Sequence, residues 1–369
     1  MIITLLVFIL LLGILVFVHE LGHFLAAKRA GVRVDEFAFG FKPRLLSKKI
    51  GQTTYAINAI PLGGYVKLYG EKETETGRES FRSKSASWKF IIFIAGSTMN
   101  LVLAWLILTI LFSVGFNPLT PGVAANPLVD SRQEVLIDEI APGSPAEQAG
   151  LKKGERIESV NDRQMATVGE FIVTVDQLAG EDIVLGVRDP LEGTSRQVEL
   201  TPRQNPPEGE GRLGVVVSSS GEVRTSLLKA PVASVIEVGR IIGLSAAGFA
   251  GFVKDLVVKQ EVSENVTGIV GAGALTGIAR RLGVDYLAQL LAIVSIGLAV
   301  VNLVPILPLD GGHVVALAYE KLAGRPLSER HFNTFAAVGL AMVLGIFLVV
   351  TYKDIVRFNV IDRILNAFQ

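Results

Sequence analysis

Cysteine is absent from this chain of 369 residues, and charged residues are scarce, at 19% of the total. Without thiols the chain forms no disulfide and binds no metal through thiolate, so any metal ligands are His, Asp or Glu. Lys and Arg together number 35, as do Asp and Glu, and a chain of zero net charge gives no sign of nucleic-acid binding. Half of the residues are apolar, which is typical of an integral membrane protein.

Four apolar stretches approach or exceed the roughly 20 residues that a helical membrane span needs. They predict transmembrane helices over about residues 2–27, 90–116, 286–309 and 332–352. A further apolar stretch, 241–253, would be only about 20 Å long as a helix, against about 30 Å of hydrocarbon. We therefore expect residues 231–285 to form an amphipathic or interfacial helical segment. Glu237 and Arg240 lie one helical turn apart and can form an ion pair, so a fifth membrane span through this segment is the alternative.

The loop after the first predicted span sets the orientation. Residues 28–89 hold thirteen Lys or Arg against six Asp or Glu, and a loop with this bias stays in the cytoplasm. Both chain ends and the long segment 117–230 then lie outside the cytoplasm. This predicts a membrane core made of residues 1–116 and 286–369, interrupted by an extracytoplasmic domain over 117–230.

The first predicted span contains His19-Glu20-Leu21-Gly22-His23 in its last third. On a helix, histidines at i and i+4 share one face and can bind a single Zn²⁺, while Glu20 can act as a general base. Ionisable side chains inside a span cost about 2.5–3.5 kcal/mol each, so they indicate function. The motif also occurs by chance in unrelated helices, and two histidines leave a zinc site incomplete.

A third ligand is expected from Asp310, which follows the third apolar stretch. The segment Asn302–His313 holds two prolines and two glycines that should break the helix, and such irregular backbone is tolerated at membrane depth where it lines a site. His19, His23 and Asp310 would leave a fourth position for water, as a catalytic zinc site requires. Taken alone, Asp310 could equally be a helix cap at the membrane boundary.

Three segments together resemble the site-2 protease family of intramembrane zinc metalloproteases: His19 to His23, Gly96-Ser97-Thr98-Met99-Asn100, and Asn302 to Gly312. Their order and membrane placement also match, and the chain looks most like the bacterial regulator-of-sigma-E protease group. The chain departs from the pattern Asn-x-x-Pro-x-Pro-x-Leu-Asp-Gly in one place, because Leu307 replaces the second proline and Pro308 follows it.

The resemblance implies a polytopic α-helical membrane protein with four transmembrane helices, a membrane-associated β-hairpin and one extracytoplasmic PDZ-like α+β domain. It implies a zinc metalloendopeptidase that cleaves single-span membrane proteins, such as anti-sigma factors or remnant signal peptides, in a bacterial cytoplasmic (inner) membrane. The implied residues are the zinc ligands above, Glu20 as general base, Asn302, Asn100 and Pro305 as substrate-positioning or oxyanion candidates, and Gly63, Gly64 and Tyr65 as substrate-strand candidates.

Two β-rich regions have their own sequence signals. Phe37, Phe39 and Phe41 alternate with small or polar residues, as do Tyr55, Ile57 and Ala59, which predicts paired strands. In 135–201, turn residues punctuate short apolar strands, and Ser144 is expected to cap a helix that runs to Gln148 and ends at Gly150. A PDZ groove would bind a peptide as an added strand, and the alternative is a β-rich spacer without a ligand.

Two other functions remain possible from the sequence. A PDZ-bearing membrane scaffold without proteolysis has no need of the general base Glu20, and a metal transporter would carry ionisable residues along several spans. A single metal site near one face favours the protease.

Overall fold

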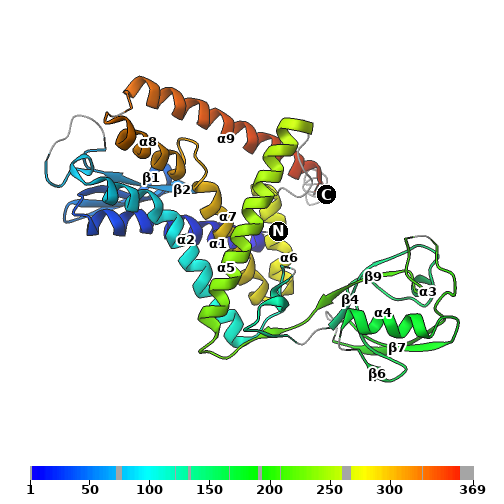
Figure 1. The fold of residues 1–369 in the computed structure, drawn as a ribbon. Coiled ribbons are helices and arrows are strands. Elements are labelled where there is room, and N and C mark those ends of the chain that lie inside the picture. The colour runs from blue at the N-terminus through cyan, green and yellow to red at the C-terminus, as the bar shows by residue number, and fades with distance from the viewer. Residues whose placement is uncertain are drawn as a thin grey trace. The chain divides into compact units, whose positions relative to one another are not determined.

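The computed structural model describes residues 2–71, 77–120, 122–131, 134–165, 167–189, 193–207, 209–259, 267–325 and 327–357. The chain forms two compact units, a core unit of residues 1–108 and 234–369 and an inserted unit of residues 109–233. Figure 1 shows the helices and the hairpin of the core unit and the small sheet of the inserted unit.

Five helices of the described chain are long and apolar enough to cross a membrane. They are α1 (Ile2–Arg29), α2 (Ala86–Val114), α5 (Ala230–Lys254), α7 (Val284–Asn302) and α9 (Glu329–Arg357). The chain is therefore a mostly helical protein with the character of a polytopic membrane protein, and the predicted count of four spans is not confirmed.

The third predicted span is shorter than expected. Helix α7 ends at Asn302 instead of continuing to 309, because Pro305 and Pro308 have no amide hydrogen to donate and clash with a preceding helical turn. Asp310 therefore does not end this helix. It is the first residue of α8 (Asp310–Ala323).

The segment before α7 also differs from expectation. Helix α5 has 25 residues and a length of about 37 Å, so the expectation of a helix too short to cross the membrane is wrong. The predicted pairing of Glu237 with Arg240 is confirmed, since Arg240 Nε donates to Glu237 Oε2 at 2.9 Å. Glu237 is buried, and its ion pair with Arg240 offsets the cost of placing two charged side chains within an apolar helix. A π-helical turn (Asp255–Lys259) continues α5.

Helix α6 (Ile269–Leu282) contacts α1, α7 and α9 of the core unit. Small residues allow its contact with α1, where a Cβ at Gly277 would lie 3.2 Å from Thr4 Cγ2. The buried carboxylate of Asp354 in α9 accepts hydrogen bonds from the amides of Gly268 and Gly271, at 2.9 and 2.7 Å. It thereby satisfies backbone donors at the start of α6.

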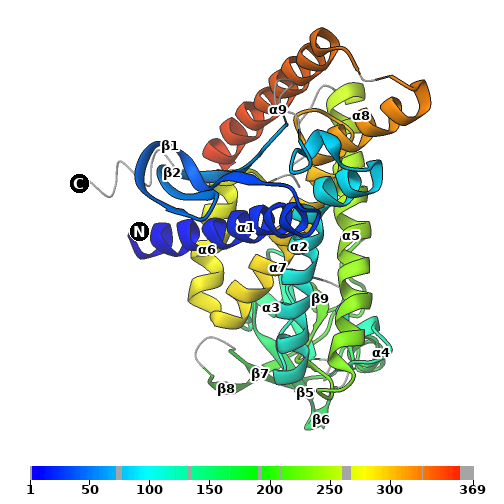
Figure 2. The same cartoon turned by 90° about the vertical axis from the view of Figure 1, so that its left-hand side faces the viewer.

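The predicted paired strands are present. Strands β1 (Val34–Ile50) and β2 (Thr53–Leu68) pair antiparallel, with several register shifts along the ladder. Phe37 is buried against α1, with its ring centroid 5.9 Å from that of Phe17 and 5.2 Å from that of Phe24. The hairpin consequently lies along α1, as the side view in Figure 2 shows.

The inserted unit is a small α+β fold around one sheet. The strand order is β8-β7-β5-β4-β9, with β6 paired to β5, and the core is made by apolar side chains of the sheet and α4, among them Ile137, Leu185 and Phe171. As predicted, Ser144 caps α3: its Oγ accepts from the Glu147 amide at 3.2 Å. The elements are α3 (Pro145–Gln148), α4 (Val168–Gln177), β4 (Glu134–Ile140), β5 (Arg156–Val160), β6 (Arg163–Gln164), β7 (Ile183–Arg188), β8 (Ser195–Leu200), β9 (Val215–Ser220), and a separate pair of β3 (Asp130–Ser131) with β10 (Val223–Arg224).

Candidate metal centre

Two glycines allow α1 and α2 to approach closely at the predicted motif. A Cβ on Gly22 of α1 would lie 2.3 Å from the carbonyl oxygen of Ala95. A Cβ on Gly96 of α2 would lie 2.3 Å from His23 Nε2 and 2.7 Å from His19 Nε2. Because neither position tolerates a side chain, the two imidazoles lie directly against the backbone of α2.

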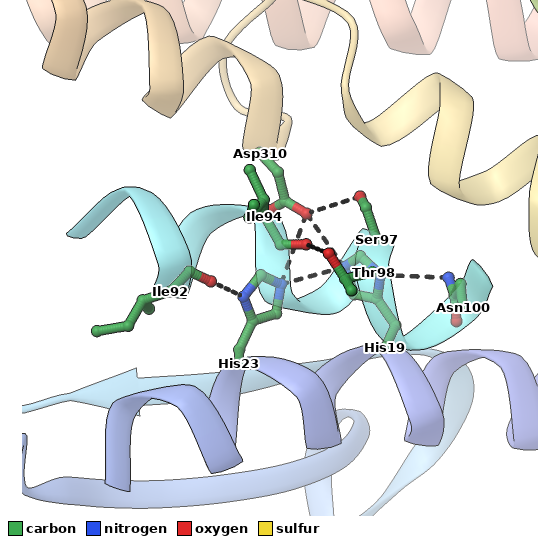
Figure 3. Close-up of polar contacts among 8 residues, drawn as sticks. All are labelled: His19, His23, Ile92, Ile94, Ser97, Thr98, Asn100 and Asp310. Atoms are coloured by element: carbon green, nitrogen blue, oxygen red, sulfur yellow. Dashed lines mark hydrogen bonds and ion pairs between the residues drawn. The ribbon is translucent and has the colours of Figure 1, made fainter. Parts of the chain in front are cut away.

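The three predicted ligands meet in space. The Nε2 atoms of His19 and His23 are 3.2 Å apart, and Asp310 Oδ2 lies 3.5 Å from the first and 3.6 Å from the second. Their side chains are 13%, 15% and 17% exposed. Figure 3 shows both imidazoles projecting from α1 toward the carboxylate of Asp310.

These distances suit a tetrahedral metal ion. Ligand atoms about 2.0–2.1 Å from a tetrahedral ion are separated by about 3.4 Å, and Zn²⁺ takes this geometry with histidine and carboxylate ligands. The three observed separations of 3.2, 3.5 and 3.6 Å bracket that value. The residues therefore fit three corners of a zinc site, and the fourth corner has no ligand from a His, Cys, Asp or Glu among the described residues.

The segment Leu303–Gly312 turns tightly to bring Asp310 to this position. A Cβ on Gly311 would lie 2.2 Å from the Leu303 carbonyl oxygen, and one on Gly312 would lie 2.4 Å from the Leu307 amide nitrogen. Only glycine fits at these two positions of the turn. The prolines end α7, and the glycines let α8 start immediately beside the returning chain.

Helix α2 supplies the partners around the ligands. The Ile92 carbonyl oxygen lies 2.7 Å from His23 Nδ1, and the Asn100 side-chain amide lies 3.3 Å from His19 Nδ1. Ser97 Oγ donates to Asp310 Oδ2 at 3.5 Å. The sequence had singled out residues 96–100 by family resemblance alone. The roles of Ser97 and of the Ile92 carbonyl were missed, since backbone groups and a common residue type give no signal of their own.

Strand β2 lies beside the predicted general base. A Cβ on Gly64 would lie 2.9 Å from Glu20 Cγ and 2.9 Å from the Ala38 carbonyl oxygen. The neighbouring candidates are oriented elsewhere: a Cβ on Gly63, whose φ is +104°, would collide with the Phe41 ring, and the Tyr65 hydroxyl donates to Glu36 Oε1 at 3.0 Å. Of the three substrate-strand candidates, Gly64 is thus placed next to Glu20.

The remaining candidates lie near the turn that leads to Asp310. Asn302 is half-buried at the end of α7, and its side chain makes no hydrogen bond within the described part of the chain. Pro305 lines a separate cavity of about 620 Å³ with residues of α8 and α9. His313 stacks on Phe93, with ring centroids 5.0 Å apart, and burial lowers its pKa below the usual value. It is a packing residue of the centre.

Two histidines spaced to bind one metal ion, with a glutamate between them and an aspartate from a distant helix beside them, are the arrangement of a metallopeptidase-type centre. The histidines and the glutamate lie on a helix long enough to cross a membrane. The comparison with known families agrees. The chain belongs to peptidase family M50, which matches residues 7–346, and the resemblance to the site-2 protease family is confirmed.

Relatives cover nearly the whole chain. A candidate zinc metalloprotease of Clostridium acetobutylicum is 30% identical over 351 residues, which are 94% of this chain and 96% of that protein. A candidate zinc metalloprotease of Campylobacter jejuni is 31% identical, over 95% of this chain and 92% of its own length. The zinc metalloprotease RasP of Geobacillus kaustophilus is 27% identical, over 95% of this chain and 97% of its own length.

Proposed function

We propose that this chain is an intramembrane zinc metalloendopeptidase that cleaves single-span membrane proteins within or near the bilayer. One observation supports this most directly: the side chains of His19, His23 and Asp310 meet with tetrahedral spacing. Glu20 lies on α1 between the two histidines. Membership of peptidase family M50 and relatives named as zinc metalloproteases point the same way.

In this proposal, His19 Nε2, His23 Nε2 and a carboxylate oxygen of Asp310 hold the zinc ion. When bound, zinc supplies Lewis-acid activation of water and of the scissile carbonyl group. The close approach of α1 and α2 at Gly22 and Gly96 excludes other side chains from the ligand cluster. The three ligands are thereby held in a fixed arrangement before substrate arrives.

Glu20 is the proposed general base. Its carboxylate takes a proton from the attacking water and then gives that proton to the amide nitrogen that leaves. Asn302 is a candidate donor to the substrate backbone or to the developing oxyanion, since its side chain has no hydrogen bond within the described residues. Pro305 shapes the turn that leads from Asn302 toward Asp310.

The substrate is proposed to lie extended along strand β2. A helical peptide bond is shielded by its own hydrogen bonds, so cleavage requires local unwinding and replacement partners for the backbone. Within the described chain, residues 64–67 of β2 pair on one side only, with residues 36–39 of β1, so their other side is an edge to which an extended segment can add. Gly64 lies against Glu20, and a segment added near Gly63, Gly64 and Tyr65 would therefore run past the general base.

We propose four membrane spans, formed by α1, α2, α7 and α9, with α5 on or partly within the membrane. Asp310 must reach the centre on α1 from just beyond the end of α7, so both helices run from outside toward the cytoplasm. If α5 crossed, the chain would have to return before α7. Helix α6, which follows α5, has only 14 residues, about 21 Å, and is too short for that crossing.

The proposed home is the bacterial cytoplasmic membrane, with the inserted unit and both termini outside the cytoplasm. We propose that the inserted unit is a PDZ-like domain that binds or screens an extended peptide. Strand β9 ends the sheet order of this unit, and α4 contacts it. An end strand beside a helix is the arrangement by which PDZ domains add a peptide strand. Anti-sigma factors and remnant signal peptides are candidate substrates.

The test uses two tagged single-span substrates, one with a Gly-Pro pair in the middle of its apolar helix and one with an uninterrupted Leu-rich helix. Purified wild-type protein in detergent should contain about one zinc ion per chain and cleave the first substrate faster. The Glu20→Gln variant should keep its zinc and lose cleavage, and Asp310→Ala should lose zinc. A zinc-loaded wild type that cleaves neither substrate would instead favour the scaffold function.

A further inference from the structure

The two histidines at the centre direct equivalent nitrogen atoms toward each other. Their Nε2 atoms are 3.2 Å apart and face Asp310 Oδ2, and their Nδ1 atoms face α2. A metal-binding nitrogen must offer its lone pair, so the proton of each neutral imidazole has to be on Nδ1. The partner of each Nδ1 therefore decides whether the ring can bind metal.

For His23 this partner is unambiguous. Nδ1 lies 2.7 Å from the Ile92 carbonyl oxygen, and a carbonyl oxygen only accepts hydrogen bonds. The proton is consequently on Nδ1, and Nε2 is free to bind metal. The same relation holds in metal sites generally, where a second interaction of the ligand histidine fixes its tautomer.

For His19 the partner is the side-chain amide of Asn100, which has a donor end and an acceptor end. With Asn100 Nδ2 placed 3.3 Å from His19 Nδ1, the ring nitrogen would have to accept. The proton would then move to Nε2, where it would block the metal. In the same orientation the buried Asn100 Oδ1 has no hydrogen-bond partner in the described structure.

A rotation of the amide by 180° exchanges its two ends. Oδ1 then accepts from His19 Nδ1–H, Nδ2 takes the interior position, and the Nε2 lone pair of His19 points toward Asp310. We infer that Asn100 is a positioning residue that fixes the metal-binding tautomer and the ring orientation of His19 through its side-chain carbonyl. This inference rests on the proposed metal site and deepens it.

The backbone holds Asn100 in place for this role. Its main-chain carbonyl accepts a hydrogen bond from Ser295 Oγ of α7 at 2.8 Å, and both residues are fully buried. Asn100 is therefore tied to the helix that precedes the Asp310 turn. One helix, α2, thus orients both histidines, through the Ile92 carbonyl and the Asn100 side chain, and it contacts Asp310 through Ser97.

The first experiment measures zinc affinity of purified full-length protein by competition with a chromophoric chelator. Asn100→Leu keeps the approximate volume and removes the acceptor, and it should weaken zinc binding about 10–100-fold. Asn100→Asp keeps an acceptor and should bind close to the wild type. If Asn100 instead donated to His19, Asp would be as harmful as Leu. Ser295→Ala removes the hydrogen bond to the Asn100 main chain but keeps the side-chain acceptor, so it should weaken zinc binding less than Asn100→Leu does.

The second experiment needs no variant of Asn100. Nitrogen NMR of zinc-loaded wild-type protein with ¹⁵N-labelled histidine side chains should show a proton on Nδ1 of both metal-bound histidines. A metal-bound histidine without a proton on Nδ1, or an Asn100→Leu protein with wild-type zinc affinity, overturns the inference. Absence of zinc binding in the wild type would overturn the proposed function instead.

Discussion

Gly96→Ala tests the centre with the smallest possible change in a side chain. The added Cβ would lie 2.3 Å from His23 Nε2 and 2.7 Å from His19 Nε2, whereas non-bonded heavy atoms prefer about 3.5 Å. The two imidazoles must therefore move by about 1 Å, which is several times the roughly 0.2 Å tolerance of metal–ligand distances. Zinc affinity should fall at least 100-fold, the upper end of the loss caused by substituting outer partners of metal ligands.

The fold should survive this substitution. Overpacking costs about 1–3 kcal/mol, and replacing glycine by alanine inside a helix returns about 1 kcal/mol. The free energy of unfolding should consequently fall by only about 0–2 kcal/mol, so that a loss of zinc is separable from a loss of structure.

The assay compares zinc affinity and thermal unfolding of the detergent-purified variant with those of Gly297→Ala. Gly297 lies inside α7, and a Cβ there would meet no atom within 4 Å, so the same chemical change should leave zinc binding unaltered. A folded Gly96→Ala protein that binds zinc as tightly as the wild type would show that Gly96 does not adjoin the ligands.

Three further outcomes follow from the structure. Gly64→Val places a branched side chain against Glu20 and should reduce cleavage about 100-fold, the cost of a 1 Å misplacement of a reacting group. Zinc content should be unchanged, and a variant that cleaves as fast as the wild type would show that Gly64 has no part in positioning Glu20 or the substrate. Asp354→Ala removes the acceptor for two amides at the start of α6 and should lower the free energy of unfolding by about 2–4 kcal/mol without loss of zinc. A variant as stable as the wild type would contradict the capping role of Asp354. Removal of metal by a chelator should abolish cleavage and added Zn²⁺ should restore it in the wild type but not in Glu20→Gln, whereas cleavage by the metal-free protein would exclude zinc as the cofactor.

The sequence predicted the local features well. Long apolar stretches gave the helices of the membrane core, and alternating aromatic residues gave β1 and β2, because both patterns depend on neighbours along the chain. The turn chemistry around Ser144 predicted the cap of α3 for the same reason. The extent of α5 was missed, because a charged pair at Glu237 and Arg240 interrupts the apolar pattern and their mutual ion pair is a product of folding.

The helix boundary at Asn302 shows the limit of reading an apolar run. Residues 303–309 are apolar enough to continue a span, but two prolines prevent the helical hydrogen bonds. Hydrophobicity alone therefore extended the predicted helix by seven residues beyond its observed end.

What the sequence by itself determined is the ligand types and their pattern: His19 and His23 share a helix face because helical spacing requires it, and the missing cysteine restricts a third ligand to His, Asp or Glu. Only the tertiary structure decided that Asp310 lies within 3.6 Å of both histidines, that Gly64 adjoins Glu20, and that Asn100 faces His19 Nδ1. Each of these contacts joins segments far apart in the chain, and their geometry depends on how closely the helices pack at Gly22 and Gly96, which no local pattern encodes.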